Sequence, residues 1–343
     1  MDSNPLVQAR DLSVSFSSSR ALRQARSVRA VDQVNLDVLP GETLCLVGES
    51  GSGKTSLART IGGLLRPSSG TITFDDRDIS SLKGRTLHAF RRRVQFVFQD
   101  PYESLNPRQR VGEIVAEPLL VHGIARRRRD IESRVVESLE ECGLSPGSSF
   151  YRTYPSELSG GQRQRVSIAA ATILRPQLLI ADEPVSMLDV SVRAGIIRLL
   201  MELRQAHNLT LVFITHDLSL AWAIGDRLAV MYAGRLLEVG TPQAVVGHPG
   251  HPYTSALLAS IPSTDPSHRL PNTHLKSDTS VGAPSGCCFR LRCPYAMERC
   301  AASVPELTDV SVNGEPHLSA CLRHSELAAE LVGLDQLQEG APE

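Results

Sequence analysis

The sequence predicts an α/β fold with a parallel sheet at its centre. Up to about residue 245, amphipathic segments alternate with short apolar runs, which are 43–48, 92–99, 177–182 and 210–215. These runs predict buried strands, whereas residues 131–142 and 192–206 repeat apolar side chains every three or four positions and predict helices. Strands that alternate with helices favour a layered domain in which the strands are parallel.

Changes in residue composition divide the chain further. We expect an α/β domain over residues 1–247, interrupted by a mostly helical subdomain at about 101–175. From residue 248 Pro, Ser, Thr and His dominate, which predicts a linker followed by a small cysteine-containing extension that ends near residue 326. The tail, residues 327–343, is expected to form a short helix or no fixed structure.

Charge and hydropathy narrow the function. The chain carries 36 basic and 37 acidic residues, and aromatic residues make up only 4%. Its basic runs are not interleaved with aromatic side chains, so nucleic acid is not an expected partner. No apolar run approaches the roughly 20 residues of a membrane span, and the N-terminus lacks a signal-peptide core. These features predict a soluble, cytoplasmic protein.

A glycine-rich segment stands between the first predicted buried strand and a predicted helix. Its sequence GESGSGKT has the pattern G-x-x-x-x-G-K-[ST], in which glycines let successive N–H groups surround a phosphate and a helix N-terminus adds positive charge. Lys54 can reach the β- and γ-phosphates, and the Thr55 hydroxyl can ligate Mg²⁺. The predicted nucleotide-binding residues here are Gly48, Ser50, Gly51, Ser52, Gly53, Lys54, Thr55 and Ser56.

Two carboxylates follow the apolar run LLIA, at the point where that predicted strand leaves the sheet. Asp182 would complete the Mg²⁺ shell, directly or through water. Glu183 is expected to be the general base that polarises the attacking water.

A second candidate anion site opens another predicted helix. The segment LSGGQ contains Ser159, Gly160, Gly161 and Gln162, and a serine followed by glycines at a helix N-terminus can hold a phosphate. One nucleotide does not need two such sites from one chain. We therefore expect each nucleotide to lie between two subunits, with one motif from each.

The order of these motifs resembles that of the ATP-binding-cassette (ABC) ATPases. The resemblance covers about residues 8–245 and implies a P-loop domain with a RecA-like core, an inserted helical subdomain and a β-subdomain. It implies ATP as the nucleotide, Gln99 as a further Mg²⁺ ligand that couples to a membrane partner, and His216 as a γ-phosphate contact. By the same resemblance Asp189 contacts the opposite subunit, and Phe16 stacks on adenine.

The segments FQDPYESLNPR and HPGHPYTSALLASIP resemble the oligopeptide/dipeptide importers, a subfamily that includes nickel and glutathione importers. Within it the chain is more similar to the F-type than to the D-type ATPase. The resemblance implies a second, different ATPase chain, two membrane permeases and, indirectly, an extracytoplasmic solute-binding protein. It places the chain at the cytoplasmic face of the membrane as a peripheral subunit. A soluble ABC ATPase acting in translation or DNA repair is the alternative.

Five of the seven cysteines lie in the last 57 residues. Four thiolates, those of Cys287, Cys293, Cys300 and Cys321, can hold a [4Fe–4S] cluster or a Zn²⁺ ion. Their spacing is wider than that of usual zinc pairs and is similar to that of the importer subfamily's C-terminal region, which implies the iron–sulfur cluster. Cys288 is expected not to be a ligand.

Overall fold

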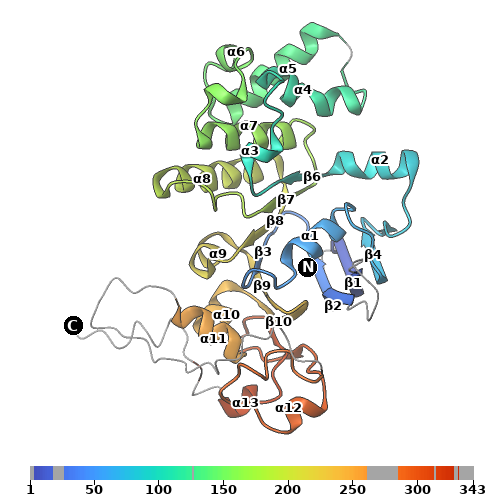
Figure 1. Ribbon diagram of the computed structural model, residues 1–343, viewed down its shortest axis with the longest axis vertical. Helices are drawn as coiled ribbons and strands as arrows, with labels where there is room; N and C mark the ends of the chain where they lie inside the picture. The colour runs from blue at the N-terminus through green and yellow to red at the C-terminus, as the bar shows by residue number, and fades with distance from the viewer. Residues whose placement is uncertain are drawn as a thin grey trace, which may run out of the picture.

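The centre of the molecule is an eight-stranded sheet in the order β11-β12-β10-β9-β3-β8-β7-β6 (Figure 1). This computed structural model describes residues 4–17, 27–125, 127–260, 285–312, 314–327 and 331. The strands are β3 (Thr43–Val47), β6 (Val94–Val97), β7 (Leu178–Asp182), β8 (Thr210–Thr215), β9 (Arg227–Tyr232), β10 (Arg235–Gly240), β11 (Thr308–Asp309) and β12 (His317–Ser319). Strands β6, β7, β8, β3 and β9 run parallel, which confirms the predicted parallel sheet.

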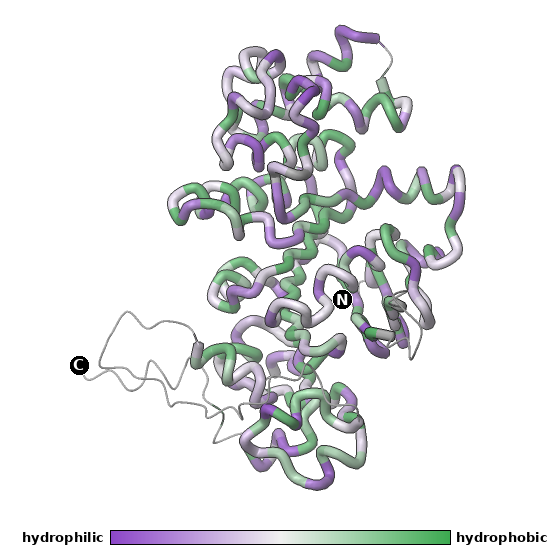
Figure 2. The backbone as a smooth tube through the Cα atoms, in the orientation of Figure 1, coloured by the Kyte–Doolittle hydropathy of each residue, from purple (hydrophilic) through white to green (hydrophobic). Residues whose placement is uncertain are grey.

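Both faces of the central strands β3, β7 and β8 are covered, because these strands are buried at every position rather than at alternate ones. Along β3, Leu44 and Leu46 point into one hydrophobic cluster, and Cys45 and Val47 point into another. Such two-sided burial is typical of parallel strands covered by helices. Figure 2 shows the resulting column of hydrophobic residues through the middle of the molecule.

An antiparallel sheet with the order β2-β1-β4-β5 packs beside the central one and forms the β-subdomain. Its strands are β1 (Val7–Ser17), β2 (Ser27–Val38), β4 (Ser69–Phe74) and β5 (Arg77–Asp78). Two helices, α1 (Lys54–Ile61) and α2 (Gly84–Arg93), contribute to the same hydrophobic cluster.

The predicted helical insertion is confirmed. It comprises α3 (Pro101–Ser104), α4 (Val111–Val121), α5 (Arg128–Glu141), α6 (Gly147–Phe150) and α7 (Gly160–Thr172), and it forms one end of the molecule (Figure 1). Helices α8 (Val190–His207) and α9 (Leu218–Ile224) then cover the central sheet. No helix in the described part of the chain is long and apolar enough to cross a membrane.

The C-terminal region is joined to the central sheet. Its elements are α10 (Pro242–Gly247), α11 (Pro252–Ala259), α12 (Arg299–Ala302) and α13 (His324–Leu327), and β12 pairs with β10. The prediction of a linker from residue 248 is wrong over 252–259, because Pro252 occupies the first turn of α11, where proline favours a helix. Residues 261–284 and the tail, apart from Leu327 and Leu331, lie outside the described residues.

Candidate active site

The glycine-rich loop connects β3 to α1, as the sequence predicts. Gly48 has a φ of 154°, and a Cβ atom there would lie 2.1 Å from the carbonyl oxygen of Met231. Gly53 has a φ of 105°, and its Cβ would lie 2.1 Å from the carbonyl oxygen of Ala30. Only glycine fits at these two positions, because the loop packs directly on the backbones of β9 and β2.

Lys54 is the first residue of α1 and is almost fully buried. Its ammonium group donates to the carbonyl oxygens of Gly48 at 2.7 Å and Glu49 at 2.8 Å. Burial lowers the pKa of Lys54, and the carboxylates of Glu183, Asp182 and Glu49 act in the opposite direction. The loop thus holds a lysine ammonium inside its own curve, next to the N-terminus of a helix that can bind an anion.

The Thr55 hydroxyl lies 3.0 Å from the Asp182 carboxylate, so the end of β7 meets the first turn of α1. Burial raises the pKa of Asp182, and the hydrogen bond from Thr55 lowers it. A hydroxyl and a carboxylate in contact supply the oxygen ligands that Mg²⁺ prefers. These residues therefore fit the predicted metal site.

Three polar side chains from three different strand ends meet beside this pair. The Glu183 carboxylate lies 3.3 Å from Gln99 Nε2 and 3.4 Å from His216 Nδ1. Glu183 has a φ of 46°, an αL conformation that is uncommon for a residue other than glycine. The structure therefore brings together Gln99, Glu183 and His216, which the sequence selected from segments far apart in the chain.

A pocket of about 680 Å³ opens at this place, which is in the size range of small-molecule sites. Its lining combines the loop with the strand-end residues: Ala30, Glu49, Ser50, Gly51, Gly53, Lys54, Thr55, Ser56, Gln99, Glu183 and His216. The sequence analysis did not select Ala30 or Glu49. Ala30 carries no polar group that could have marked it, and Glu49 occupies a variable position of the loop pattern.

Several predicted residues lie away from this pocket. Ser159 caps α7, with its hydroxyl accepting a hydrogen bond from the backbone N–H of Gln162 at 3.3 Å. Asp189 stands at the N-terminus of α8, beside the exposed side chains of Met187 and Val190. Phe16, near the end of β1, is 46% exposed. None of these residues lines the pocket around Lys54.

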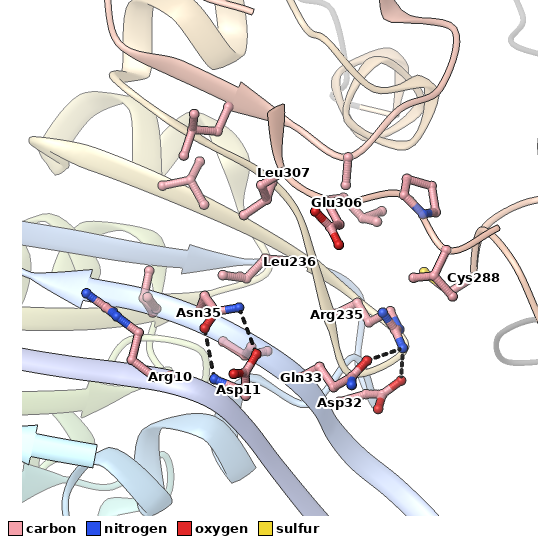
Figure 3. A pocket seen from close by; sticks show the side chains of 18 of the residues that line it. Arg10, Asp11, Asp32, Gln33, Asn35, Arg235, Leu236, Cys288, Glu306 and Leu307 are labelled. Carbon is pink, nitrogen blue, oxygen red and sulfur yellow. Dashed lines mark hydrogen bonds and ion pairs between the residues drawn. The ribbon is translucent and has the colours of Figure 1, made fainter. Parts of the chain in front are cut away.

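A second cavity, of about 540 Å³, lies between the β-subdomain, β10 and the C-terminal region. Its charged side chains largely pair with one another, as Figure 3 shows for Arg235, which contacts Asp32 and Gln33. Asn35 likewise accepts a hydrogen bond from the backbone of Asp11. A triphosphate needs converging donors, and the glycine-rich loop with Lys54 provides them in the other pocket.

Four cysteines of the C-terminal region line one small cavity: Cys287, Cys293, Cys300 and Cys321. Cys288 does not line it, and its sulfur lies 3.7 Å from the carbonyl oxygen of Tyr232. Burial raises the pKa of the Cys321 thiol to about 12. Among the described residues, no three His, Cys, Asp or Glu side chains are close enough to hold a single metal ion.

Thiolates bound to one Zn²⁺ ion lie about 4 Å apart, because each Zn–S bond is near 2.3 Å and the angles are tetrahedral. The four cysteines share a cavity without such an approach. Their donor set, four thiols and no carboxylate in the cavity lining, is one that both iron–sulfur clusters and Zn²⁺ ions take in proteins.

Comparison with known proteins agrees with the motifs. Residues 31–186 match the family model described as ABC transporter, and residues 237–300 match the one described as oligopeptide/dipeptide transporter, C-terminal region. A peptide import ATP-binding protein of Brucella ovis is 42% identical over 325 residues, which cover 94% of this chain and 99% of the relative. The oligopeptide transport ATP-binding protein YkfD of Bacillus subtilis is 43% identical, covering 89% of this chain and 92% of the relative.

Solved structures support the same assignment. The ATP-binding cassette MJ0796 bound to ADP and phosphate is 29% identical, with a TM-score of 0.61, over 69% of this chain and 98% of the cassette. The protein cbiO1 of Clostridium perfringens is 28% identical, with a TM-score of 0.62, over 71% of this chain and 91% of that protein. The chain therefore belongs to the ABC transporter ATPase family and carries the C-terminal region of the oligopeptide/dipeptide transporters.

Proposed function

We propose that this protein is the ATP-hydrolysing subunit that powers a membrane importer of peptides. The observation that carries the proposal is the convergence of Gln99, Glu183 and His216 beside the Thr55–Asp182 pair and the Lys54 loop. The relatives named for peptide import, together with the C-terminal match, support the transported class.

In this proposal each side chain has one role. Lys54 and the loop N–H groups bind the β- and γ-phosphates, and Thr55, Gln99 and Asp182 hold Mg²⁺, which neutralises the phosphate charge. Glu183 accepts a proton from the attacking water, and His216 contacts the γ-phosphate while lying against the Glu183 carboxylate.

The separation of the signature from the pocket supports a nucleotide shared between two ATPase subunits. Ser159 and its neighbours begin α7 outside the pocket lining, so a second chain would have to supply that motif to the nucleotide. Met187 and Val190 are 59% and 80% exposed, and apolar side chains this exposed at the start of α8 suit a protein contact. We propose a different, D-type chain as the partner.

We propose that two permease subunits contact the helical subdomain, which places the chain as a peripheral subunit at the cytoplasmic face of the membrane. Tyr102, Leu120 and Val121 are each more than half exposed on this subdomain. Gln99 precedes α3. A displacement of the helical subdomain would therefore be transmitted to the site through a short segment of chain. An extracytoplasmic binding protein would deliver the solute without touching this chain.

The test is reconstitution of this chain with its partner ATPase and two permeases in proteoliposomes. Peptide-loaded binding protein should stimulate ATP hydrolysis, and peptide should accumulate inside the vesicles only when ATP is supplied. A chain that hydrolyses ATP fully on its own and does not associate with any permease would instead support the soluble alternative, a role in translation or DNA repair.

For the C-terminal cysteines we propose a [4Fe–4S] cluster held by Cys287, Cys293, Cys300 and Cys321. The shared cavity and the all-thiol donor set support it. A metal centre would also add folding energy to a region with few regular elements. Zn²⁺ remains the alternative metal.

Protein purified without oxygen should be brown, with a broad absorption shoulder near roughly 400 nm from thiolate-to-iron charge transfer. Cys293→Ser should remove the colour and make residues 285–325 more sensitive to protease, because a ligand is lost. Cys288→Ser is the matched control and should keep the colour, since its sulfur points toward Tyr232. A colourless preparation with one zinc per chain would contradict the iron–sulfur assignment.

A further inference from the structure

Each polar group of Glu49, the first variable residue of the glycine-rich loop, has a partner. Its carboxylate receives two hydrogen bonds from the guanidinium of Arg292, at 2.8 and 3.1 Å. Its backbone N–H donates to the Tyr253 hydroxyl at 2.9 Å, and its carbonyl oxygen accepts from Lys54 at 2.8 Å. The carbonyl oxygen also accepts from the backbone N–H of Ser52 at 3.2 Å. Arg292 and Tyr253 come from the C-terminal region, outside the residues that match the ABC transporter model.

Arg292 is held in place by its surroundings. It directly precedes Cys293, and its guanidinium lies 5.7 Å from the ring centre of Tyr232 and 5.8 Å from that of Phe289. Its side chain is only 21% exposed. A planar guanidinium that contacts aromatic rings and bonds a carboxylate with both nitrogens has one favoured orientation. The Glu49 carboxylate therefore fixes Arg292, and Arg292 fixes Glu49.

The aromatic rings beside Arg292 connect residues 285–325, which we call the cysteine region, to strand β9, on which the glycine-rich loop packs. Phe289 packs against Tyr232 at 5.3 Å and Tyr253 at 5.4 Å, and these two tyrosines lie 4.8 Å apart. Tyr232 follows Met231, whose carbonyl oxygen is the atom that excludes a side chain at Gly48. Phe289 lies between Cys287 and Cys293 in sequence and shares one hydrophobic core with both cysteines and with Tyr232 at the end of β9.

We infer that Arg292 and Tyr253 are positioning residues for the ATP site: through Glu49 the cysteine region holds the phosphate-binding loop in its binding shape. The inference rests on the proposed role of this loop in binding ATP. A loop rich in glycine and serine would otherwise lose conformational freedom when it closes on the phosphates. A loop already held by contacts outside it avoids that cost, which raises affinity.

The positive charge of Arg292 should favour ATP binding as well. Glu49 lines the pocket that would receive the triphosphate, and a bare carboxylate there would repel it. Arg292 neutralises this carboxylate from the side of the cysteine region. Removing the guanidinium would free the loop and expose the negative charge together, so both effects would weaken ATP binding.

The experiment compares two arginines of the same region in the full-length protein. We expect Arg292→Ala to weaken binding of a fluorescent ATP analogue about tenfold, which corresponds to ~1.4 kcal/mol. The kcat at saturating ATP should change less than about threefold, because no group that contacts the reacting phosphate is removed. Arg290→Ala, which removes a guanidinium whose hydrogen bond among the described residues goes to the carbonyl of Ser285, should bind ATP as the unaltered protein does.

Three further variants separate positioning from general damage. Arg292→Lys should recover part of the affinity, because it restores the charge but not the two-nitrogen contact. Tyr253→Phe keeps the ring and removes only the hydroxyl that accepts from Glu49, so a smaller loss of about threefold is expected. The double variant Glu49→Gln/Arg292→Ala should bind ATP no more weakly than Arg292→Ala, since the two side chains act as one unit.

The outcomes are distinguishable. Equal affinities for Arg292→Ala and Arg290→Ala, or weaker ATP binding by the double variant than by Arg292→Ala, would overturn the inference and leave the ATP site intact. An equal thermal unfolding temperature for both arginine variants would show that any loss of affinity is not a loss of folding. Normal ATP binding by Lys54→Ala would contradict the ATP site itself.

Discussion

Glu183→Gln should bind ATP and Mg²⁺ as the unaltered protein does and hydrolyse ATP at least about a hundredfold more slowly, the scale on which a general base contributes. The substitution keeps the size and shape of the side chain and removes its negative charge and its ability to accept a proton. Because binding survives and turnover does not, the variant should also accumulate as a closed, ATP-bound dimer of ATPase subunits.

The matched control is Glu202→Gln on α8. Glu202 is 67% exposed and pairs only with Arg198, one helical turn away, at 4.0 Å. The same chemical change at this surface position should leave hydrolysis unchanged, since exposed pairs of this kind contribute little. Single-turnover measurement of ATP cleavage after acid quenching separates the chemical step from product release. Turnover near that of the unaltered protein in Glu183→Gln would exclude Glu183 as the base.

The sequence was sufficient to predict strands β3, β6, β7 and β8 and most of the residues that line the pocket around Lys54, because both follow from local patterns. Apolar runs such as 178–182 predict buried strands. Parallel strands that are joined by helices all end at the same edge of the sheet. Gln99, Glu183 and His216 follow three such strands, so their convergence could be expected from topology. The glycines of the loop are explained by close backbone contacts, because a Cβ atom at Gly48 or Gly53 would clash with a neighbouring carbonyl oxygen.

The link between the cysteine region and the loop could not be predicted in this way. Arg292 and Glu49 are 243 positions apart, and neither belongs to a motif that requires the other. None of the C-terminal cysteines lies in a nucleotide motif, so the sequence pattern gives no reason to connect them with ATP binding. The contact through Arg292 predicts a different result, namely weaker ATP binding when the cysteine region loosens. Helix α11 was missed for a related reason, because its burial against β9 and Phe289 is a tertiary property.

Lys54→Ala should lower the affinity for ATP by about one to two orders of magnitude, because hydrogen bonds to charged groups contribute about 1.5–3 kcal/mol. Hydrolysis should fall further, since Lys54 also faces the negative charge that the transferred phosphoryl group carries in the transition state. The substitution also removes the donor that closes the loop onto the Gly48 and Glu49 carbonyls. Binding is measured by titration with a fluorescent ATP analogue, and hydrolysis by phosphate release at saturating ATP.

Lys83→Ala is the control for the loss of a lysine. Lys83 precedes α2 as its N-cap residue, makes no side-chain capping hydrogen bond and does not line the pocket, so its loss should change neither binding nor hydrolysis. The two variants carry the same net charge, so a difference between them reports the position of the ammonium group and not the charge of the protein. If Lys54→Ala binds and hydrolyses ATP as Lys83→Ala does, residues 48–55 are not the phosphate site. If only Lys54→Ala fails, the buried ammonium inside the loop is the group that holds the phosphates.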